Sequence, residues 1–202
     1  EKAGYEVIFP EKMSSLCCGT PWESKGFIKH ADQKSSELEA ALKTASEGGK
    51  YPILCDTSPC LYRMRRVMDE KLKLYEPVEF IYEFLMDKLS FKQVNEIVAI
   101  HSTCTTTKMG LTPQLRTVAE ACAQKVVLPS EVGCCGFAGD RGFNFPEINA
   151  YALRKLKPVL DESQVVAGYS NSRTCEIGLS NNGGIPYQSI IYLVDRVTEP
   201  KN

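Results

Sequence analysis

The residues of this chain that could do chemistry are its cysteines, and four of them form two adjacent pairs. The triplets Cys17–Gly19 and Cys134–Gly136 both have the sequence Cys-Cys-Gly, in which the glycine allows a tight turn or a close approach to a bulky group. Soft thiolates clustered in this way bind metal ions or iron–sulfur clusters. The alternatives are two pairs of buried cysteines or two strained vicinal disulfides. We favour a thiolate-ligated site, built twice.

The composition is that of an ordinary globular protein. The 202 residues are 43% hydrophobic and 24% charged, and the net charge is −1. These values give no reason to expect nucleic acid or an acidic membrane surface as a partner. No apolar run approaches the ~20 residues of a membrane-spanning helix. Nine cysteines cannot all pair within one chain, and their number favours metal or redox chemistry in an intracellular protein. We expect a cytoplasmic protein, with or without peripheral association at the inner face of the membrane.

The chain contains an internal duplication. Residues 1–10 and 120–129 align without a gap, and a Cys-Cys-Gly triplet follows each. A Gly-Phe pair, a helical stretch, a short apolar strand and one further cysteine then follow in the same order. That cysteine is Cys60 in the first copy and Cys175 in the second, 42 and 40 positions after the second cysteine of the triplet. Two related structural units are therefore predicted.

We predict a first repeat over residues 1–92 and a second over residues 93–202. The second opens with an apolar strand and Cys104, which lies 30 positions before Cys134. The same offset before Cys17 falls upstream of the first residue. We therefore expect the first repeat to be truncated at its N-terminus and the chain to be a fragment of a longer protein. The alternative is that the first repeat never had this prefix.

Short apolar strands that alternate with helices predict parallel βαβ units. The fold class is therefore α/β, with two pseudo-repeated Rossmann-like βα layers and mainly parallel strands. The predicted strands are residues 5–9, 51–55, 94–101, 125–128 and 164–168. The predicted helices are residues 35–46, 61–72, 78–89, 113–124, 146–157 and 188–197. We expect Ser36 and Glu39 to form a capping box and Thr112 to cap the helix that follows it.

The repeats define two sets of candidate ligands. Sites in open α/β sheets lie at the carboxyl ends of strands, and one cysteine or pair follows a predicted strand at each expected position. The second repeat offers four thiolates, enough for tetrahedral zinc or a cubane cluster: Cys104, Cys134, Cys135 and Cys175. The first offers three, with the fourth expected upstream: Cys17, Cys18 and Cys60. We therefore expect the second site to bind more tightly and the thiols of the first to be more reactive.

The remaining polar candidates have less specific roles. Cys55 is interpreted as a core or nearby thiol, and Cys122 as a small hydrophobic residue buried on a helix face. His101 either donates a hydrogen bond to the site or packs at the edge of the core. Five arginines near the cysteines either offset the charge of a cluster, meet an acidic partner or are simply solvated: Arg63, Arg65, Arg66, Arg141 and Arg173. No Gly-x-Gly-x-x-Gly or Walker sequence occurs, so no flavin or nucleotide site is encoded.

The repeated pattern Cys…Cys-Cys-Gly…Cys resembles the cysteine-rich CCG domain of heterodisulfide reductase B subunits, glycolate oxidase iron–sulfur subunits and lactate-utilisation proteins. Three stretches are most similar to the C-terminal region of FAD-linked, iron–sulfur D-lactate dehydrogenases: residues 14–27, 52–60 and 168–179. Such proteins carry a flavin-binding domain and a ferredoxin-like segment before this module. The resemblance implies a 4Fe-4S cluster or zinc at the seven cysteines, FAD in the preceding part of a longer chain, and electron transfer to a quinone or a cytochrome-side acceptor.

One departure from this resemblance concerns the last cysteine of each motif. Heterodisulfide reductase B subunits end each motif in Cys-x-x-Cys and bind an unusual cluster through five cysteines, whereas this chain has Thr57 and Ser172 at the earlier position. Three functions stay open. They are an electron-transfer module of a flavin-dependent D-2-hydroxyacid dehydrogenase, inactive on its own; a thiol–disulfide or heterodisulfide-type reductase; and a structural zinc or docking module.

Overall fold

The computed structural model describes residues 1–201 and divides into two compact units. Unit 1 comprises Glu1 and Ala3–Pro77, and unit 2 comprises Lys2 and the chain from Val78 onward. The helical segment after Pro77 contributes Val78 and Ile81 to the core of unit 2. The compact units therefore divide before residue 92. No helix within the described residues is long and apolar enough to cross a membrane.

Unit 2 is built on a four-stranded parallel sheet with the strand order β5-β4-β6-β7. Its strands are β4 (Val94–Ile100), β5 (Ala123–Val127), β6 (Ala167–Ser170) and β7 (Tyr187–Ser189). Val98 of β4 lies opposite Val126 of β5 on one side and Ala167 of β6 on the other. From β4 the chain first adds β5 on one side of the sheet and then adds β6 and β7 on the other side. The carboxyl ends of the neighbouring strands β4 and β6 therefore form a topological switch point. The α/β fold class is confirmed.

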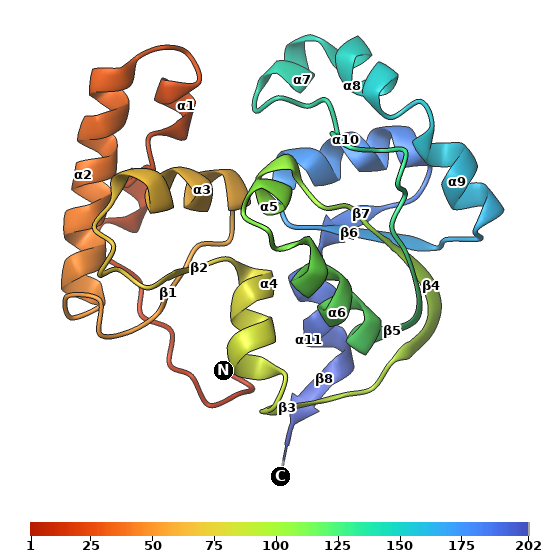
Figure 1. The fold of residues 1–202 in the computed structure, drawn as a ribbon, viewed down its shortest axis with the longest axis horizontal. Helices are drawn as coiled ribbons and strands as arrows, with labels where there is room; N and C mark the ends of the chain where they lie inside the picture. The colour runs from red at the N-terminus through yellow and green to blue at the C-terminus, as the bar shows by residue number, and fades with distance from the viewer. Residues whose placement is uncertain (202) are drawn as a thin grey trace. The chain divides into compact units, whose positions relative to one another are not determined.

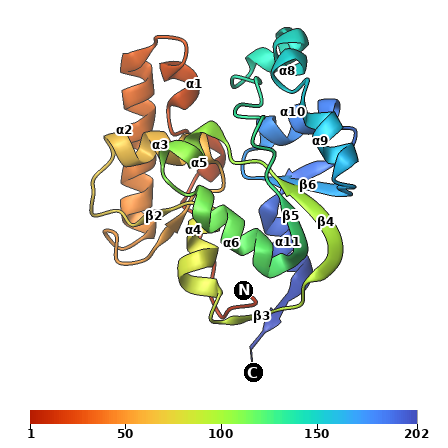
Figure 2. The same cartoon turned by 45° about the vertical axis from the view of Figure 1, so that its right-hand side comes forward.

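Helices cover both faces of this sheet, as Figures 1 and 2 show. One face carries α6 (Thr112–Cys122) and α11 (Ile190–Val197), and the other carries α8 (Pro146–Ala152), α9 (Leu156–Glu162) and α10 (Arg173–Gly183). Successive side chains of a strand point to opposite faces. Val98 and Ile100 accordingly join the first core cluster, whereas Ala99 joins the second. The result is a three-layer α/β/α unit.

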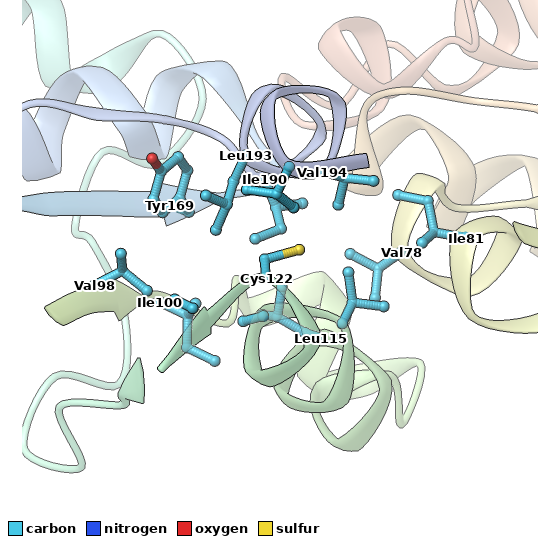
Figure 3. Close-up of a cluster of buried hydrophobic side chains, with 14 residues drawn as sticks. Val78, Ile81, Val98, Ile100, Leu115, Cys122, Tyr169, Ile190, Leu193 and Val194 are labelled. Carbon is cyan, nitrogen blue, oxygen red and sulfur yellow. The ribbon is translucent and has the colours of Figure 1, made fainter. Parts of the chain in front are cut away.

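The core between the sheet, α6 and α11 is drawn in Figure 3. Val98 and Ile100 of β4 and Leu193 of α11 are fully buried there. Cys122 points into the middle of this cluster, and none of its surface is exposed. Burial raises the pKa of its thiol to about 12. The interpretation of Cys122 as a small buried hydrophobic residue is therefore confirmed.

The remaining elements of unit 2 are short. They are α4 (Pro77–Phe80), which begins at the unit boundary, the π-helical turn η2 (Ile81–Leu85), β3 (Leu89–Phe91), α5 (Cys104–Lys108), α7 (Arg141–Asn144) and β8 (Thr198–Pro200). β3 and β8 pair in antiparallel fashion, with Ser90 opposite Glu199. This ribbon therefore joins the beginning of unit 2 to its end.

Unit 1 is smaller and mainly helical. Its elements are the 3-10 turn η1 (Met13–Ser15), α1 (Thr20–Glu23), α2 (Ile28–Ala45), β1 (Ile53–Leu54), α3 (Ser58–Val67) and β2 (Leu74–Tyr75). β1 and β2 pair in parallel, with Ile53 opposite Leu74. A parallel pair needs a crossover connection, and α3 supplies it. Unit 1 thus contains one βαβ unit.

Two predictions for unit 1 are wrong. Residues 5–9 form no strand, and Val7, Ile8 and Phe9 are 56%, 61% and 67% exposed. An apolar run becomes a strand only where a neighbour accepts its backbone hydrogen bonds. The predicted capping box is also wrong, because α2 begins eight residues before Ser36. The Ser36 hydroxyl lies inside the helix and donates to the Asp32 carbonyl.

Several helix boundaries in unit 2 also differ from the predictions. Thr112 is the first residue of α6 and not its cap, a position that Leu111 occupies. The helix predicted over residues 146–157 ends at Ala152, and a second helix begins at Leu156. Pro158 explains the break, because proline is tolerated in the first turn of a helix but not in its interior.

Candidate thiolate site

The four candidate ligands of unit 2 come from three segments that follow strands of the sheet. Cys104 begins α5 after β4, and Cys175 is the third residue of α10 after β6. Cys134 and Cys135 lie in the loop between β5 and α7. Because β4 and β6 are neighbours, two of these segments leave the sheet at its switch point.

Two of the four sulfurs meet. The Sγ atoms of Cys135 and Cys175 are 3.0 Å apart, and both residues are buried. Cys134 is exposed and contacts the Cys135 thiol. Cys104 is also exposed. Among residues 1–201, no three histidine, cysteine, aspartate or glutamate side chains form a group that could hold a metal ion. The structure therefore joins Cys134, Cys135 and Cys175 by pairwise contacts, and the full set of four stays a prediction.

The thiols of this loop are held in the protonated form. The contact with Cys134 lowers the pKa of Cys135, but the contact with Cys175 and burial outweigh it and raise that pKa to about 12. The contact with Cys135 and burial raise the pKa of Cys134. Thiolates, not thiols, ligate metals, so binding at this site must release protons.

The Cys-Cys-Gly turn of unit 2 is held by its backbone. Gly136 has a φ of +71°, and a Cβ there would lie 2.6 Å from the Cβ of Ala152. Its amide donates to the Cys134 sulfur at 3.4 Å. The side-chain amide of Asn149, on α8, donates to the Cys135 carbonyl. The turn therefore needs glycine for both its conformation and its close packing.

Unit 1 repeats this arrangement. Cys18 is buried beside the thiol of Cys60. Cys60 is the third residue of α3, the helix that follows β1. Gly19 has a φ of +88°, and its amide donates to the Cys17 sulfur at 3.4 Å. The contact with Cys60 lowers the pKa of Cys18 to about 6, with further help from Thr20 and against the effect of burial. The same contact raises the pKa of Cys60.

The other residues singled out by sequence have mostly structural environments. Cys55 is half-buried, its thiol donates to the Thr57 carbonyl at 3.6 Å, and burial raises its pKa to about 11. His101 is 4% exposed at the end of β4, and its Nε2 atom has no hydrogen-bond partner within the described residues. Burial lowers its pKa to about 4, so the ring is neutral at pH 7.

The five arginines differ from one another. Arg63 is buried, and its Nε donates to the Cys18 carbonyl. The other four are exposed, and Arg65 among them donates to the Leu74 carbonyl. All five lie near cysteines in the sequence, and this proximity alone does not distinguish them. The available signal was spacing, because Arg63 lies three residues after Cys60 on one helix and must share its face.

Comparisons with known proteins place part of this chain in a family. The chain is 23% identical to Lactate utilization protein A 1 of Bacillus mycoides strain KBAB4, over 80% of the chain and 71% of that protein. It is 26% identical to protein YkgE of Escherichia coli strain K12, over 77% of the chain and 70% of that protein. It is also 26% identical to Lactate utilization protein A of Bacillus velezensis strain DSM 23117, over 83% and 76%.

The family model that matches describes a cysteine-rich domain, CCG, and covers residues 98–180. The matched segment begins within β4 and contains all four candidate ligands of unit 2. It ends within α10, after the helical turn that carries Cys175. The resemblance inferred from the cysteine pattern is therefore confirmed, and residues 98–180 match the cysteine-rich domain CCG.

Proposed function

We propose that this chain is the cysteine-rich electron-transfer module of a flavin-dependent D-lactate or related D-2-hydroxyacid dehydrogenase. The observation that carries the proposal is the meeting of Cys135 and Cys175 within the segment that matches the CCG family. Similarity to proteins named for lactate utilisation supports the substrate class. The flavin-binding and ferredoxin-like domains belong, in this proposal, to the same longer cytoplasmic chain, and a quinone or cytochrome-side carrier is the acceptor.

The donor chemistry fits an iron–sulfur cluster or zinc. The ligands are soft thiols, and each adjacent pair precedes a glycine whose positive φ sets the turn. We propose that Cys104, Cys134, Cys135 and Cys175 hold one such group, and that Cys17, Cys18 and Cys60 form the related site of unit 1. Cys104 and Cys134 are exposed, and in this proposal their sulfurs join the buried pair when the group binds.

An iron–sulfur cluster, if bound here, would supply one-electron storage, whereas zinc would have only a structural role. The chain itself must supply thiolates, exclude water from part of the site and fix the turn. The second and third tasks are visible in unit 2, because Cys135 and Cys175 are buried and Asn149 holds the Cys135 carbonyl. A buried position also limits access of oxidants, which protects a thiolate-bound cluster from loss.

The two units are proposed to be duplicates. In each, the second cysteine of the triplet contacts a cysteine at the third position of a helix that follows a parallel strand. In each, the glycine has a positive φ and its amide donates to the sulfur of the first cysteine. Independent origin of these shared details is less economical than duplication of one βα layer.

Anaerobic purification followed by analysis of iron, zinc and acid-labile sulfide tests the proposal. We expect iron and sulfide to be present in the protein, to fall in Cys135→Ser and Cys175→Ser, and to persist in Cys122→Ala. Cysteine 122 is the matched control because it is buried in a core that lacks the other cysteines. Zinc without sulfide would support the structural or docking module instead, and the absence of any metal from anaerobic protein would refute the proposal.

A thiol–disulfide reductase is the second candidate, and the 3.0 Å sulfur separation favours it. In that reaction the Cys135 and Cys175 thiols would form one disulfide, a substrate disulfide would be cleaved to two thiols, and the two protons would pass to the products. Metal-free reduced protein mixed with a small disulfide should then release two thiols per chain. Cys135 and Cys175 should afterwards no longer react with an alkylating reagent. The same result in Cys175→Ser would exclude this candidate.

A further inference from the structure

Arg63 is a buried charged residue of unit 1 that is held by several polar partners. Its side chain is 2% exposed, and it is the largest fully buried side chain in the described residues. Its Nε donates to the Cys18 carbonyl at 3.0 Å and to the Ser35 hydroxyl at 3.1 Å. Its Nη1 and Nη2 atoms pair with Glu23 at 2.6 Å and Asp32 at 2.8 Å. A buried guanidinium is tolerated only when it is paired in this way.

The same helix carries this guanidinium and a candidate ligand. Arg63 and Cys60 are three residues apart on α3, so their side chains lie on one face. Gly19 makes the close approach feasible, because a Cβ at that position would lie 2.9 Å from the Arg63 Nε and 2.3 Å from the Ala31 carbonyl oxygen. The turn, the ligand and the guanidinium are thus packed against one another.

In unit 2 an uncharged side chain holds the corresponding carbonyl of the Cys-Cys-Gly turn. The position three residues after Cys175 is Gly178, where a Cβ would lie 2.5 Å from the Asn149 side-chain nitrogen. That nitrogen donates to the Cys135 carbonyl, the group equivalent to the Cys18 carbonyl. A neutral amide from α8 therefore takes the place that a guanidinium from α3 takes in unit 1.

We propose that Arg63 is a positioning residue for the thiolate site of unit 1, which it holds through the Cys18 carbonyl. The guanidinium fixes the Cys-Cys-Gly turn against Cys60, while Glu23 and Asp32 balance its charge. The two sites therefore differ in the group that holds the turn as well as in ligand number. This inference rests on the proposed function in one respect, namely that the cysteines bind a thiophilic group.

Three variants of α3 separate position from charge. Arg63→Gln removes the charge and the planar fork, whereas Arg63→Lys keeps the charge but cannot bridge the carbonyl, the hydroxyl and two carboxylates. Arg66→Gln is the matched control, because Arg66 lies on the same helix, is exposed, and reaches Glu23 only at 3.5 Å. Amide hydrogen exchange across β1 and β2 reports whether unit 1 stays folded in each variant.

The first readout is the alkylation rate of each cysteine in the metal-free protein, resolved by peptide mass spectrometry. In Arg63→Gln we expect the rates of Cys17, Cys18 and Cys60 to rise by about tenfold or more, as the loss of a hydrogen bond from a charged donor implies. Arg63→Lys should give a smaller rise, and Arg66→Gln none. The thiols of unit 2 are the internal reference and should keep their rates in all three variants.

The second readout is the spectrum of bound Co²⁺, in a background that carries Cys135→Ser and Cys175→Ser so that unit 1 supplies the signal. Arg63→Gln should weaken the cobalt–thiolate charge-transfer band, and Arg66→Gln should leave it unchanged. A folded Arg63→Gln protein with the wild-type rates and band would overturn the proposal. If that variant unfolds, wild-type behaviour of a folded Arg63→Lys protein would overturn it equally.

These outcomes are distinguishable from failure of the proposed function. A protein that binds neither cobalt nor a cluster at either site would refute the proposed function. The alkylation rates of its metal-free form would still test the role of Arg63, because they need no bound group.

Discussion

The sulfurs of Cys135 and Cys175 lie 3.0 Å apart although 40 positions separate them in the sequence. The loop after β5 supplies one sulfur, and the first turn of α10 supplies the other. Such a contact is produced by the fold and not by neighbourhood in the chain. It therefore determines which cysteines react together.

Mild oxidation of the metal-free protein should link Cys135 to Cys175 before any other pair of unit 2. The vicinal pair Cys134 and Cys135 is adjacent in sequence, but an eight-membered ring disulfide is strained, whereas a bond between two elements needs only a small approach of the sulfurs. Peptide mass spectrometry after limited oxidation checks this result. Cys122 should stay unmodified as the buried control, and a dominant bond between Cys134 and Cys135 would contradict the prediction.

Loss of Cys104 should weaken metal binding in unit 2 and leave unit 1 unchanged. A tetrahedral or cubane site that falls from four thiolates to three loses a bond and a neutralising charge. We expect Cys104→Ser to bind Zn²⁺ at least about tenfold more weakly, measured by competition with a chromophoric chelator. Cys122→Ala is the control. Equal affinities for Cys104→Ser and wild type would show that Cys104 is not a ligand.

The same reasoning predicts that the two cysteine sets are protected unequally. After anaerobic reconstitution, alkylation should spare the cysteines of unit 2 more than Cys17, Cys18 and Cys60, because unit 1 has only three candidate thiolates in this chain. Site-resolved mass spectrometry measures both sets in one sample. Equal protection, or protection of unit 1 alone, would show that three thiolates suffice.

Alanine at Gly136 should destabilise unit 2 by roughly 3 kcal/mol. About 1–2 kcal/mol comes from the left-handed backbone, and the rest from the clash with Ala152. Gly139 is the matched control, since its φ is +73° but nothing lies within 4 Å of an added Cβ. Gly139→Ala should cost only the backbone term, about 1–2 kcal/mol. Urea unfolding measures both, and equal losses would mean that packing against α8 does not matter.

Acid should destabilise unit 2 through His101. Burial lowers the pKa of this histidine to about 4 in the folded state, against about 6.5 in the unfolded chain. Between these values the unfolded chain binds more protons, so the stability present above pH 6.5 is lost as the pH falls toward 4. The contribution is on the order of 3 kcal/mol. The difference in unfolding free energy between wild type and His101→Asn, measured as a function of pH, should show this loss because the contributions of the other titrating groups cancel. A difference that does not change with pH would contradict the prediction.

Sequence patterns predicted the parts of the fold that are set by local periodicity. The strand predicted over residues 94–101 agrees with β4 to within one residue, because the apolar run Ile97–Ile100 is typical of a buried parallel strand. The run at residues 5–9 is equally apolar but is exposed and forms no strand. Periodicity could not separate the two cases, because the difference lies in whether a partner strand is present.

The candidate site, like the fold, could be predicted from the sequence only in part. Residue type and spacing singled out the candidate cysteines, and the repeated pattern predicted which of them are equivalent. The groups that hold the turns could not be assigned this role from sequence. Arg63 was predicted only as one of five arginines near the cysteines and lies 45 positions from Cys18, and nothing in the sequence singled out Asn149. Such contacts depend on tertiary packing, and neither residue belongs to a recurring sequence motif.

The antiparallel ribbon of β3 and β8 places Leu89 opposite Pro200. The two ends of the segment that carries the four-stranded sheet therefore lie side by side, although the helical residues before the ribbon add Val78 and Ile81 to the same core. The ribbon acts as a clasp, because neither end of this segment can peel away without breaking the backbone pairing of the other. Fraying at the two ends of the sheet-bearing segment is therefore coupled.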